Sequence, residues 1–332
     1  MLKELATAFG VSGIEQEVRD TVIKHAKPFC DQLTVDFIGN VVAFKKGRTG
    51  NKTIMICAHM DEVGLIVTEI TKEGYLKFKP IGGVDSRVLI SKSVLIGKNK
   101  IVGVIGSKPK HLIKEDQTAP QYQDLFIDVG AKNEAELDDK INLGDYVCFD
   151  SEYVEFGDGL IKSKALDDRV GCAVLLDLMK EEYDPNTYFV FTVQEEVGCR
   201  GAKVISFTLG TDEAIVIEGT TCSDLAVDKD YQFSTKLGKG AALSILDRGS
   251  YANKCIVNKL YTSAIENKIK VQFKQTTLGG NDASAIHIAK AGIKTAVISV
   301  PCRYIHSPSS VASKDDIQSC RDILYYYLKG EV

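Results

Sequence analysis

Residues 53–64 read TIMICAHMDEVG, a short apolar run that ends in a polar group containing His59 and Asp61. A continuous apolar run of this length is typical of a strand that is buried on both faces of a sheet. From about residue 64 the pattern changes to short β-rich segments separated by glycines and charged turns, and it keeps this character to about residue 159. We therefore interpret the stretch as the point at which a second, β-rich unit interrupts an α/β unit.

Outside that middle part, strand-like and helix-like segments alternate along the chain. The predicted strands are 33–36, 41–44, 53–58, 188–193, 214–217 and 295–300, and the predicted helices are 14–27, 168–181, 283–291 and 315–328. This alternation favours a mostly parallel or mixed sheet with helices on both faces. We expect a mixed-sheet α/β/α domain formed by residues 1–63 and 160–332.

Residues 64–159 are expected to form a separate inserted domain. Short strand-like segments follow one another there without helical patterns between them, which indicates a small β-barrel or sandwich. The polar stretch 108–123 contains Pro109 and Pro120 and is predicted to be a mobile loop.

Composition excludes several classes of protein. The 332 residues are 44% hydrophobic and 26% charged with a net charge of -4, and no Lys/Arg block could follow a nucleic-acid backbone. No apolar run approaches the roughly 18 residues of a membrane span, and residues 1–6 do not resemble a secretion signal. Nine dispersed cysteines without a CxxC pair fit a reducing compartment. We expect a cytoplasmic protein that binds neither nucleic acid nor membranes.

Acidic residues and histidines gather where predicted strands end. This placement matters because open α/β sheets bind their ligands at the carboxyl ends of strands. The residues in question are His59 and Asp61 after 53–58, Glu195 and Glu196 after 188–193, Glu218 after 214–217, His306 after 295–300, and Asp167 and Asp168 at the start of the helix 168–181.

Each of these groups also has an ordinary structural interpretation. His59 and Asp61 can belong to a polar turn, Asp167 can cap a helix, and a loop histidine such as His306 often lies on the surface. The pair Glu195 and Glu196 is harder to explain in this way, because buried carboxylates without a partner are costly. One of the two can bind a metal while its neighbour faces a water molecule.

Taken together, the residues indicate a pair of metal ions. Two histidines and three carboxylates without a thiolate suit divalent ions such as zinc or cobalt. One carboxylate between the ions and two further ligands on each would leave open positions for catalysis. Such a pair lowers the pKa of a shared water, and a free glutamate beside that water can accept its proton.

Five motifs in order resemble the M42 family of metallo-aminopeptidases, and the likeness runs over nearly the whole chain. The motifs are AHMDEVG at 58–64, KALDDR at 164–169, QEEVGCRGA at 194–202, GGNDASAIH at 279–287 and VPCRYIHSP at 300–308. Two parts of the sequence depart from the common pattern. Glu218 stands where many members have aspartate, and Asn281 and Ser284 stand where Thr-Asp-Ala-Gly is more usual.

The resemblance implies a role for seven residues. It implies His59 and Glu218 as ligands of one metal, Glu196 and His306 as ligands of the other, Asp167 as the bridge, Glu195 as the general base, and Asp61 as the residue that orients His59. It also implies that the inserted domain dimerises and that the protein forms a homo-dodecamer built from dimers. Members of the family remove single residues from the amino end of peptides, with zinc as the expected metal and cobalt as a possible one.

Other functions remain open from the residues alone. The same metal site suits a co-catalytic amidohydrolase of carboxypeptidase or deacylase type, because related hydrolases use either aspartate or glutamate at the position of Glu218. A glycosidase is disfavoured, since glycoside hydrolysis normally uses two carboxylates and no metal pair. A non-catalytic scaffold is disfavoured because it would have no physical reason to keep all five expected metal ligands together with Glu195.

Overall fold

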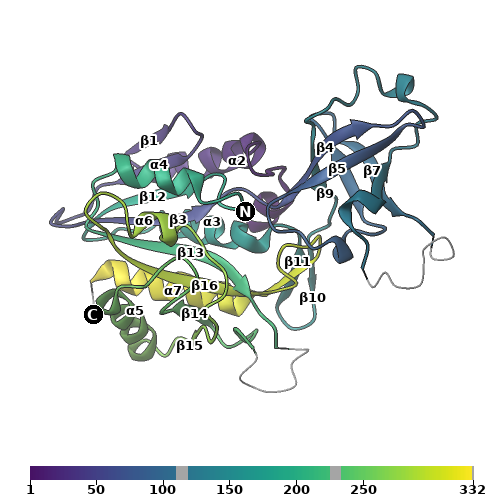
Figure 1. Ribbon diagram of the computed structural model, residues 1–332. Helices are drawn as coiled ribbons and strands as arrows, with labels where there is room; N and C mark the ends of the chain where they lie inside the picture. Colours follow the sequence, from purple (N-terminus) through teal and green to yellow (C-terminus); the bar gives the residue numbers. More distant parts are fainter. Residues whose placement is uncertain (110–118, 225–232, 331–332) are drawn as a thin grey trace.

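The computed structural model describes residues 1–109, 119–224 and 233–330. Two bodies lie side by side in Figure 1, a larger α/β body and a smaller body that contains β4, β5, β7 and β9. The larger body is built on an 11-stranded sheet and the smaller one is a closed six-stranded barrel. The mixed α/β fold with a barrel that the sequence predicts is thus confirmed.

The large sheet follows the order β1-β2-β12-β3-β13-β16-β17-β11-β10, with β14 and β15 attached beside β16. Its strands are β1 (Gln32–Val35), β2 (Val41–Lys45), β3 (Thr53–His59), β10 (Val154–Phe156), β11 (Leu160–Ser163), β12 (Asn186–Thr192), β13 (Glu213–Thr221), β14 (Ala241–Ser244), β15 (Val271–Phe273), β16 (Lys294–Arg303) and β17 (Ser310–Ser313). The four strands β12, β3, β13 and β16 are parallel to one another. Their carboxyl ends therefore lie along one edge of the sheet.

Helices cover both faces of this sheet. They are α1 (Leu2–Thr7), α2 (Gln16–Ala26), α3 (Leu166–Leu178), α4 (Arg200–Thr208), α5 (Lys254–Glu266), α6 (Ala283–Ile286) and α7 (Lys314–Lys329). Strand β3 shows why two layers form, because its apolar residues alternate between two cores. Ile54 and Ile56 join the core beneath α3 and α7, whereas Met55 and Cys57 join the core beneath α4 and α6.

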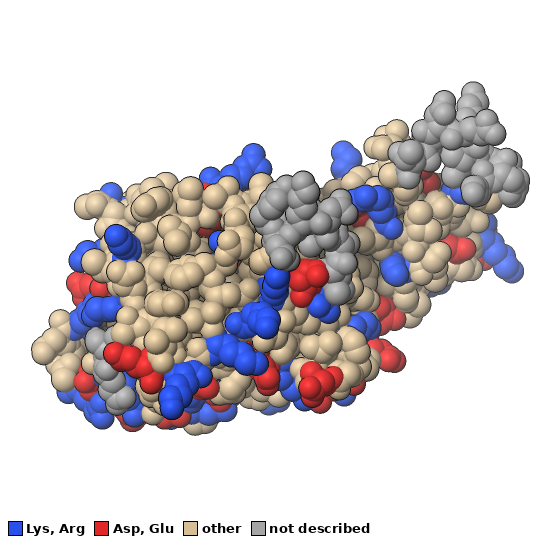
Figure 2. All heavy atoms as spheres, turned by 90° about the horizontal axis from the view of Figure 1, so that it is seen from below, with Lys and Arg blue, Asp and Glu red and all other residues tan. Residues whose placement is uncertain are grey.

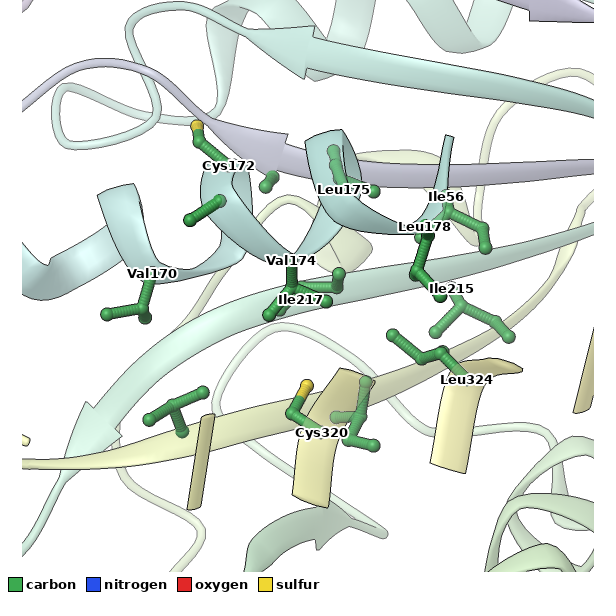
Figure 3. Close-up of a cluster of buried hydrophobic side chains, with 14 of the residues drawn as sticks. Ile56, Val170, Cys172, Val174, Leu175, Leu178, Ile215, Ile217, Cys320 and Leu324 are labelled. Carbon is green, nitrogen blue, oxygen red and sulfur yellow. The ribbon is translucent and has the colours of Figure 1, made fainter. Parts of the chain in front are cut away.

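The core beneath α3 positions the helix that carries Asp167. Figure 3 shows Leu175 and Leu178 of this helix beside Ile56 of β3 and beside β13 and α7. Burial of each such side chain stabilises the fold by about 1.5 to 3 kcal/mol. This packing fixes the position of α3 against the sheet, and with it the position of Asp167 near the carboxyl ends of the parallel strands.

The barrel consists of antiparallel strands in the closed order β4-β5-β8-β7-β6-β9. These are β4 (Gly64–Ile70), β5 (Tyr75–Ile81), β6 (Ser93–Ile96), β7 (Ile101–Ser107), β8 (Leu125–Asp128) and β9 (Tyr146–Phe149). Leu65, Leu76 and Ile105 belong to a hydrophobic cluster of its own. Short 3-10 helices occur at Lys27–Phe29, Ser86–Val88, Tyr122–Asp124 and Glu134–Leu137.

Some sequence predictions differ from the structure. The predicted helix 283–291 ends at Ile286, and turns follow it, in which Lys290 has a φ of 54° and the N–H group of Gly292 donates to the carbonyl of Ala289. Helix α5 and strands β14 and β15 were not predicted at all. Of the predicted mobile loop 108–123, residues 110–118 lie outside the described residues.

The surface and the cysteines agree with the composition. Figure 2 shows Lys and Arg interspersed with Asp and Glu on the viewed face of the larger body. All nine cysteines are free thiols. Within the described ranges, no helix has both the length and the hydropathy needed to cross a bilayer.

Candidate metal and catalytic site

The seven residues predicted to act together lie in one place, at the carboxyl-end edge of the parallel strands. His59 is the last residue of β3 and lies opposite Thr192 of β12, three residues before Glu195. Glu218 lies near the end of β13, opposite Ser299 of β16. Parallel pairing thus brings together residues that are far apart in the sequence.

Asp167 lies between the two histidines. Its Oδ1 is 3.4 Å from Nε2 of His59, and its Oδ2 is 3.3 Å from Nε2 of His306. Two ligand atoms of one tetrahedral zinc ion are about 3.4 Å apart, given Zn–N and Zn–O bonds of about 2.0 to 2.2 Å. The carboxylate therefore has one oxygen available for each of two cations.

Both histidines are oriented in the same way by backbone carbonyls. Nδ1 of His59 lies 3.0 Å from the carbonyl oxygen of Asp61, and Nδ1 of His306 lies 3.0 Å from that of Gly83. A carbonyl oxygen can only accept a hydrogen bond, so each Nδ1 carries the proton and donates it in that bond, and each neutral ring keeps a lone pair on Nε2. Both lone pairs point into the same site.

The remaining carboxylates complete two groups of donors. Oε2 of Glu218 is 3.6 Å from Nε2 of His59, and Oε1 of Glu196 is 3.3 Å from Nε2 of His306. Around Asp167 there is consequently one histidine and one glutamate on each side.

The carboxylate of Asp61 contacts the loop that carries Glu195 and Glu196. It accepts hydrogen bonds from their backbone N–H groups at 2.9 and 3.2 Å and from Ser12 Oγ at 2.6 Å. Its nearer oxygen is 3.5 Å from His59 Nδ1, farther than the backbone carbonyl. Asp61 thus orients His59 mainly through its backbone and the Glu195 loop through its side chain.

Glu195 stands beside the donor groups without belonging to either. Its Oε2 is 3.9 Å from Nε2 of His59, and its Oε1 accepts a hydrogen bond from Sγ of Cys199 at 3.4 Å. The side chain is 12% exposed. It lines a cavity of about 780 Å³ whose wall also includes Arg248 and Lys274.

The electrostatics of the site favour cations. Burial raises the pKa of Glu218 and Glu195 well above the ordinary value, and repulsion from neighbouring carboxylates adds to the rise. Burial likewise raises the pKa of Glu196 to about 7. Asp167 differs, because burial would raise its pKa, but the nearby imidazole rings of His306 and His59 outweigh burial and lower it. Divalent cations would offset the repulsion among these carboxylates and favour their charged forms.

Two atoms of the proposed metal ligands are buried without partners. Nε2 of His59 and Oε1 of Glu218 have no hydrogen-bond partner among the described residues. Buried polar atoms are almost always paired, so these two atoms mark a place where a further group binds. The donors are imidazole nitrogens and carboxylate oxygens, which fit a pair of divalent ions such as zinc or cobalt.

The sequence interpretation did not assign Asp168 to this site. Asp168 is fully buried, and its carboxylate accepts backbone N–H groups of His59 and Gly171. Helix α3 is preceded by Ala165 in a left-handed conformation, so Asp167 is not its cap, and the backbone of Asp167 is not helical. The two adjacent carboxylates thus have different roles. Asp167 faces the cavity, whereas Asp168 accepts a hydrogen bond from the backbone of His59.

The sequence analysis also did not predict a buried ion cluster that contacts the 59–62 loop. Glu62 contacts Nζ of Lys164 at 2.7 Å and a terminal nitrogen of Arg169 at 3.2 Å, while Nε of Arg169 donates to the carbonyl of Met60. The basic residues of the 164–169 motif therefore hold the 59–62 loop in place.

Comparisons with known proteins identify the family. Residues 39–323 match the M42 glutamyl aminopeptidase family. A putative aminopeptidase of Acetivibrio thermocellus is 39% identical, over 98% of this chain and 96% of its own length. The aminopeptidase APDkam598 from Desulfurococcus kamchatkensis superposes with a TM-score of 0.95 at 38% identity, covering 99% of this chain and 93% of that one. The TET1 peptidase of Pyrococcus horikoshii, whose structure shows tetrahedral or octahedral assembly, superposes with a TM-score of 0.88 at 32% identity, covering 98% of each chain.

Proposed function

Because the chain belongs to the M42 glutamyl aminopeptidase family and is thus a peptide hydrolase, we propose that it removes amino-terminal residues from peptides with the help of two divalent metal ions. The observation that carries this proposal is the position of Asp167, whose two oxygens face the Nε2 atoms of His59 and His306.

We assign His59 and Glu218 to one ion, Glu196 and His306 to the other, and Asp167 to both. The distances of 3.3 to 3.6 Å between these donor atoms support this assignment. Zinc is our first choice and cobalt the second, because the donors are nitrogen and oxygen. When bound, such a pair polarises the scissile carbonyl and lowers the pKa of a water molecule.

Glu195 is the proposed general base. It takes a proton from the attacking water and delivers it to the nitrogen of the leaving amine. Its loop is fixed by the hydrogen bond from its N–H group to Asp61, and its carboxylate opens onto the cavity. Asp61 fixes the position of Glu195 relative to His59, because its carboxylate binds the backbone of Glu195 and its carbonyl contacts Nδ1 of His59.

A second candidate function has a specific observation in its favour. The cations Arg248 and Lys274 line the same cavity as the acidic groups, and a carboxypeptidase-like amidohydrolase would use such cations to bind the terminal carboxylate of its substrate. In an aminopeptidase the same cations would face an acidic side chain of the substrate instead. The excess of carboxylates around Glu195 suits a substrate ammonium group, which favours the aminopeptidase.

Three forms of one short peptide separate these functions. The peptide is supplied with both ends free, with its amino end acetylated, or with its carboxyl end amidated. The aminopeptidase cleaves the free and amidated forms and leaves the acetylated one intact, and chelation of metal abolishes cleavage. Cleavage of the acetylated form together with resistance of the amidated form would instead establish the carboxypeptidase-like function.

We further propose that residues 64–159 form an inserted dimerisation domain beside a catalytic domain of residues 1–63 and 160–332, and that the chain assembles in the cytoplasm as a homo-dodecamer built from dimers. Val102 and Val104 of β7, 59% and 47% exposed, offer apolar surface on the barrel. The assembly of the Pyrococcus horikoshii TET1 peptidase supports the proposal. Light scattering on the Val104→Lys variant tests it, because a charge in a buried interface should yield smaller particles.

A further inference from the structure

A second group of potential ligands lies on the other side of Glu195. Ligand atoms of Glu195, Cys199 and Asp282 all lie within 4.8 Å of one another. Oε2 of Glu195 faces His59, whereas its Oε1 contacts Sγ of Cys199 at 3.4 Å. The two oxygens of Glu195 therefore face two different groups.

Asp282 supplies an independent sign that something binds there. It is fully buried, and its Oδ2 accepts a hydrogen bond from Thr192 Oγ1. Its Oδ1 has no hydrogen-bond partner among the described residues. An unpaired buried carboxylate oxygen is costly, so a cation at this position would satisfy a group that is otherwise without a partner.

We propose that Glu195, Cys199 and Asp282 form a third metal site, selective for thiophilic divalent cations such as zinc and cadmium, and that its occupation inhibits the enzyme. A cation held there would coordinate Oε1 of Glu195 and prevent this carboxylate from accepting the proton of a water molecule. The inhibition rests on the proposed function of Glu195, whereas the binding of a third ion does not.

The geometry suits such an ion. A sulfur and an oxygen that both coordinate one tetrahedral zinc ion are about 3.6 Å apart, close to the 3.4 Å between Cys199 and Glu195. On binding, the thiol of Cys199 loses its proton to solvent, so the cation is held by one thiolate and two carboxylates. Because Glu195 and Cys199 line the cavity, a water molecule can take the fourth position.

Charge also favours a third cation. Two divalent ions carry four positive charges, whereas seven acidic side chains cluster here, namely Asp61, Asp167, Asp168, Glu195, Glu196, Glu218 and Asp282. The new site differs from the proposed pair in its ligands, because it alone includes a sulfur. This difference predicts that cadmium and zinc fill it in excess and that magnesium does not.

The experiment uses the full chain with cobalt in the metal pair. Cadmium is titrated while three quantities are measured, namely the ultraviolet charge-transfer absorption of thiolate bound to cadmium, the metal content per subunit, and the rate of peptide cleavage. Cys199→Ser is the test variant, and Cys255→Ser is the matched control, because Cys255 is an exposed thiol outside the site. Each rate is expressed relative to the same variant without cadmium.

The proposal predicts a charge-transfer band and a third ion per subunit in the wild-type protein and in Cys255→Ser, with inhibition that follows the band. In Cys199→Ser the band is absent and inhibition requires at least about tenfold more cadmium. Asp282→Asn keeps the thiol and should also bind cadmium at least about tenfold more weakly. Equal bands in wild type and Cys199→Ser would overturn the site. A third ion in a protein without peptidase activity would leave the site intact and refute only the proposed function.

Discussion

Oδ2 of Asp167 lies 3.3 Å from Nε2 of His306, although the two residues are 139 positions apart in sequence. Replacement of Asp167 by Asn puts a neutral amide between His306 and His59, so one side loses its oxygen ligand. We predict that Asp167→Asn retains at most one tightly bound ion per subunit and loses at least about a hundredfold in kcat/KM. Metal analysis after gel filtration checks this, with the exposed Asp158→Asn as control. Two retained ions in Asp167→Asn would argue against the bridging role.

Asp61 accepts the backbone N–H groups of both Glu195 and Glu196. In Asp61→Asn, the side-chain NH₂ group would face one of these donors and displace the loop. The expected result is a kcat that is lower by about 10- to 100-fold, with both metal ions still bound. Steady-state kinetics with metal analysis measures it. Ser12→Ala, which removes one donor to Asp61 and leaves its charge, should have the smaller effect. An unchanged kcat in Asp61→Asn would exclude the positioning role.

Lys274 lines the cavity, and Nζ donates to the carbonyl of Leu278. A cation in this wall favours a substrate with an acidic first side chain. Lys274→Met should therefore reduce kcat/KM for a glutamyl anilide at least about tenfold relative to a leucyl anilide, the value of a hydrogen bond to a charged group. Lys259→Met, on the exposed face of α5, is the control. If the ratio of the two substrates does not change, Lys274 does not determine specificity.

The ion pair of Asp224 and Arg303 predicts a pH effect on stability. Burial alone would raise the pKa of Asp224, but hydrogen bonds from Arg303 outweigh it and lower the pKa to about 2. A carboxylate with a lowered pKa stabilises the fold above its unfolded value near 3.8, and this contribution disappears as the pH falls towards 2. Asp224→Asn should cost about 2 kcal/mol at pH 7, and less below pH 4. Urea unfolding of both proteins at several pH values measures the difference, and a gap that stays constant down to pH 3 would contradict the assignment.

The sequence was sufficient for the elements with the clearest burial. The run Thr53–Ala58 reveals β3 because both faces of the strand are buried, so every residue from Ile54 to Ala58 is apolar. The sequence becomes polar at His59, at the carboxyl end of the strand, where parallel sheets bind their ligands. The same logic located Glu218 and the Glu195 loop.

Contacts with the backbone and very short strands could not be predicted from the sequence. The carbonyl of Gly83 that orients His306 leaves no trace in residue type, and the same holds for the N–H groups that Asp61 accepts. Strands β14 and β15 have only four and three residues, too few to show a period. The approach of Cys199 to Asp282 depends on how α4 packs against α6, which is a tertiary contact.

The most direct test of the account is Glu195→Gln, which keeps the shape of the side chain and removes its ability to accept a proton. Metal content and the cleavage of a peptide with a free amino end are measured on the same preparation. The account predicts two bound ions per subunit and a rate reduced by at least about a hundredfold, the usual contribution of a general base. A variant that retains both ions and the wild-type rate would contradict it.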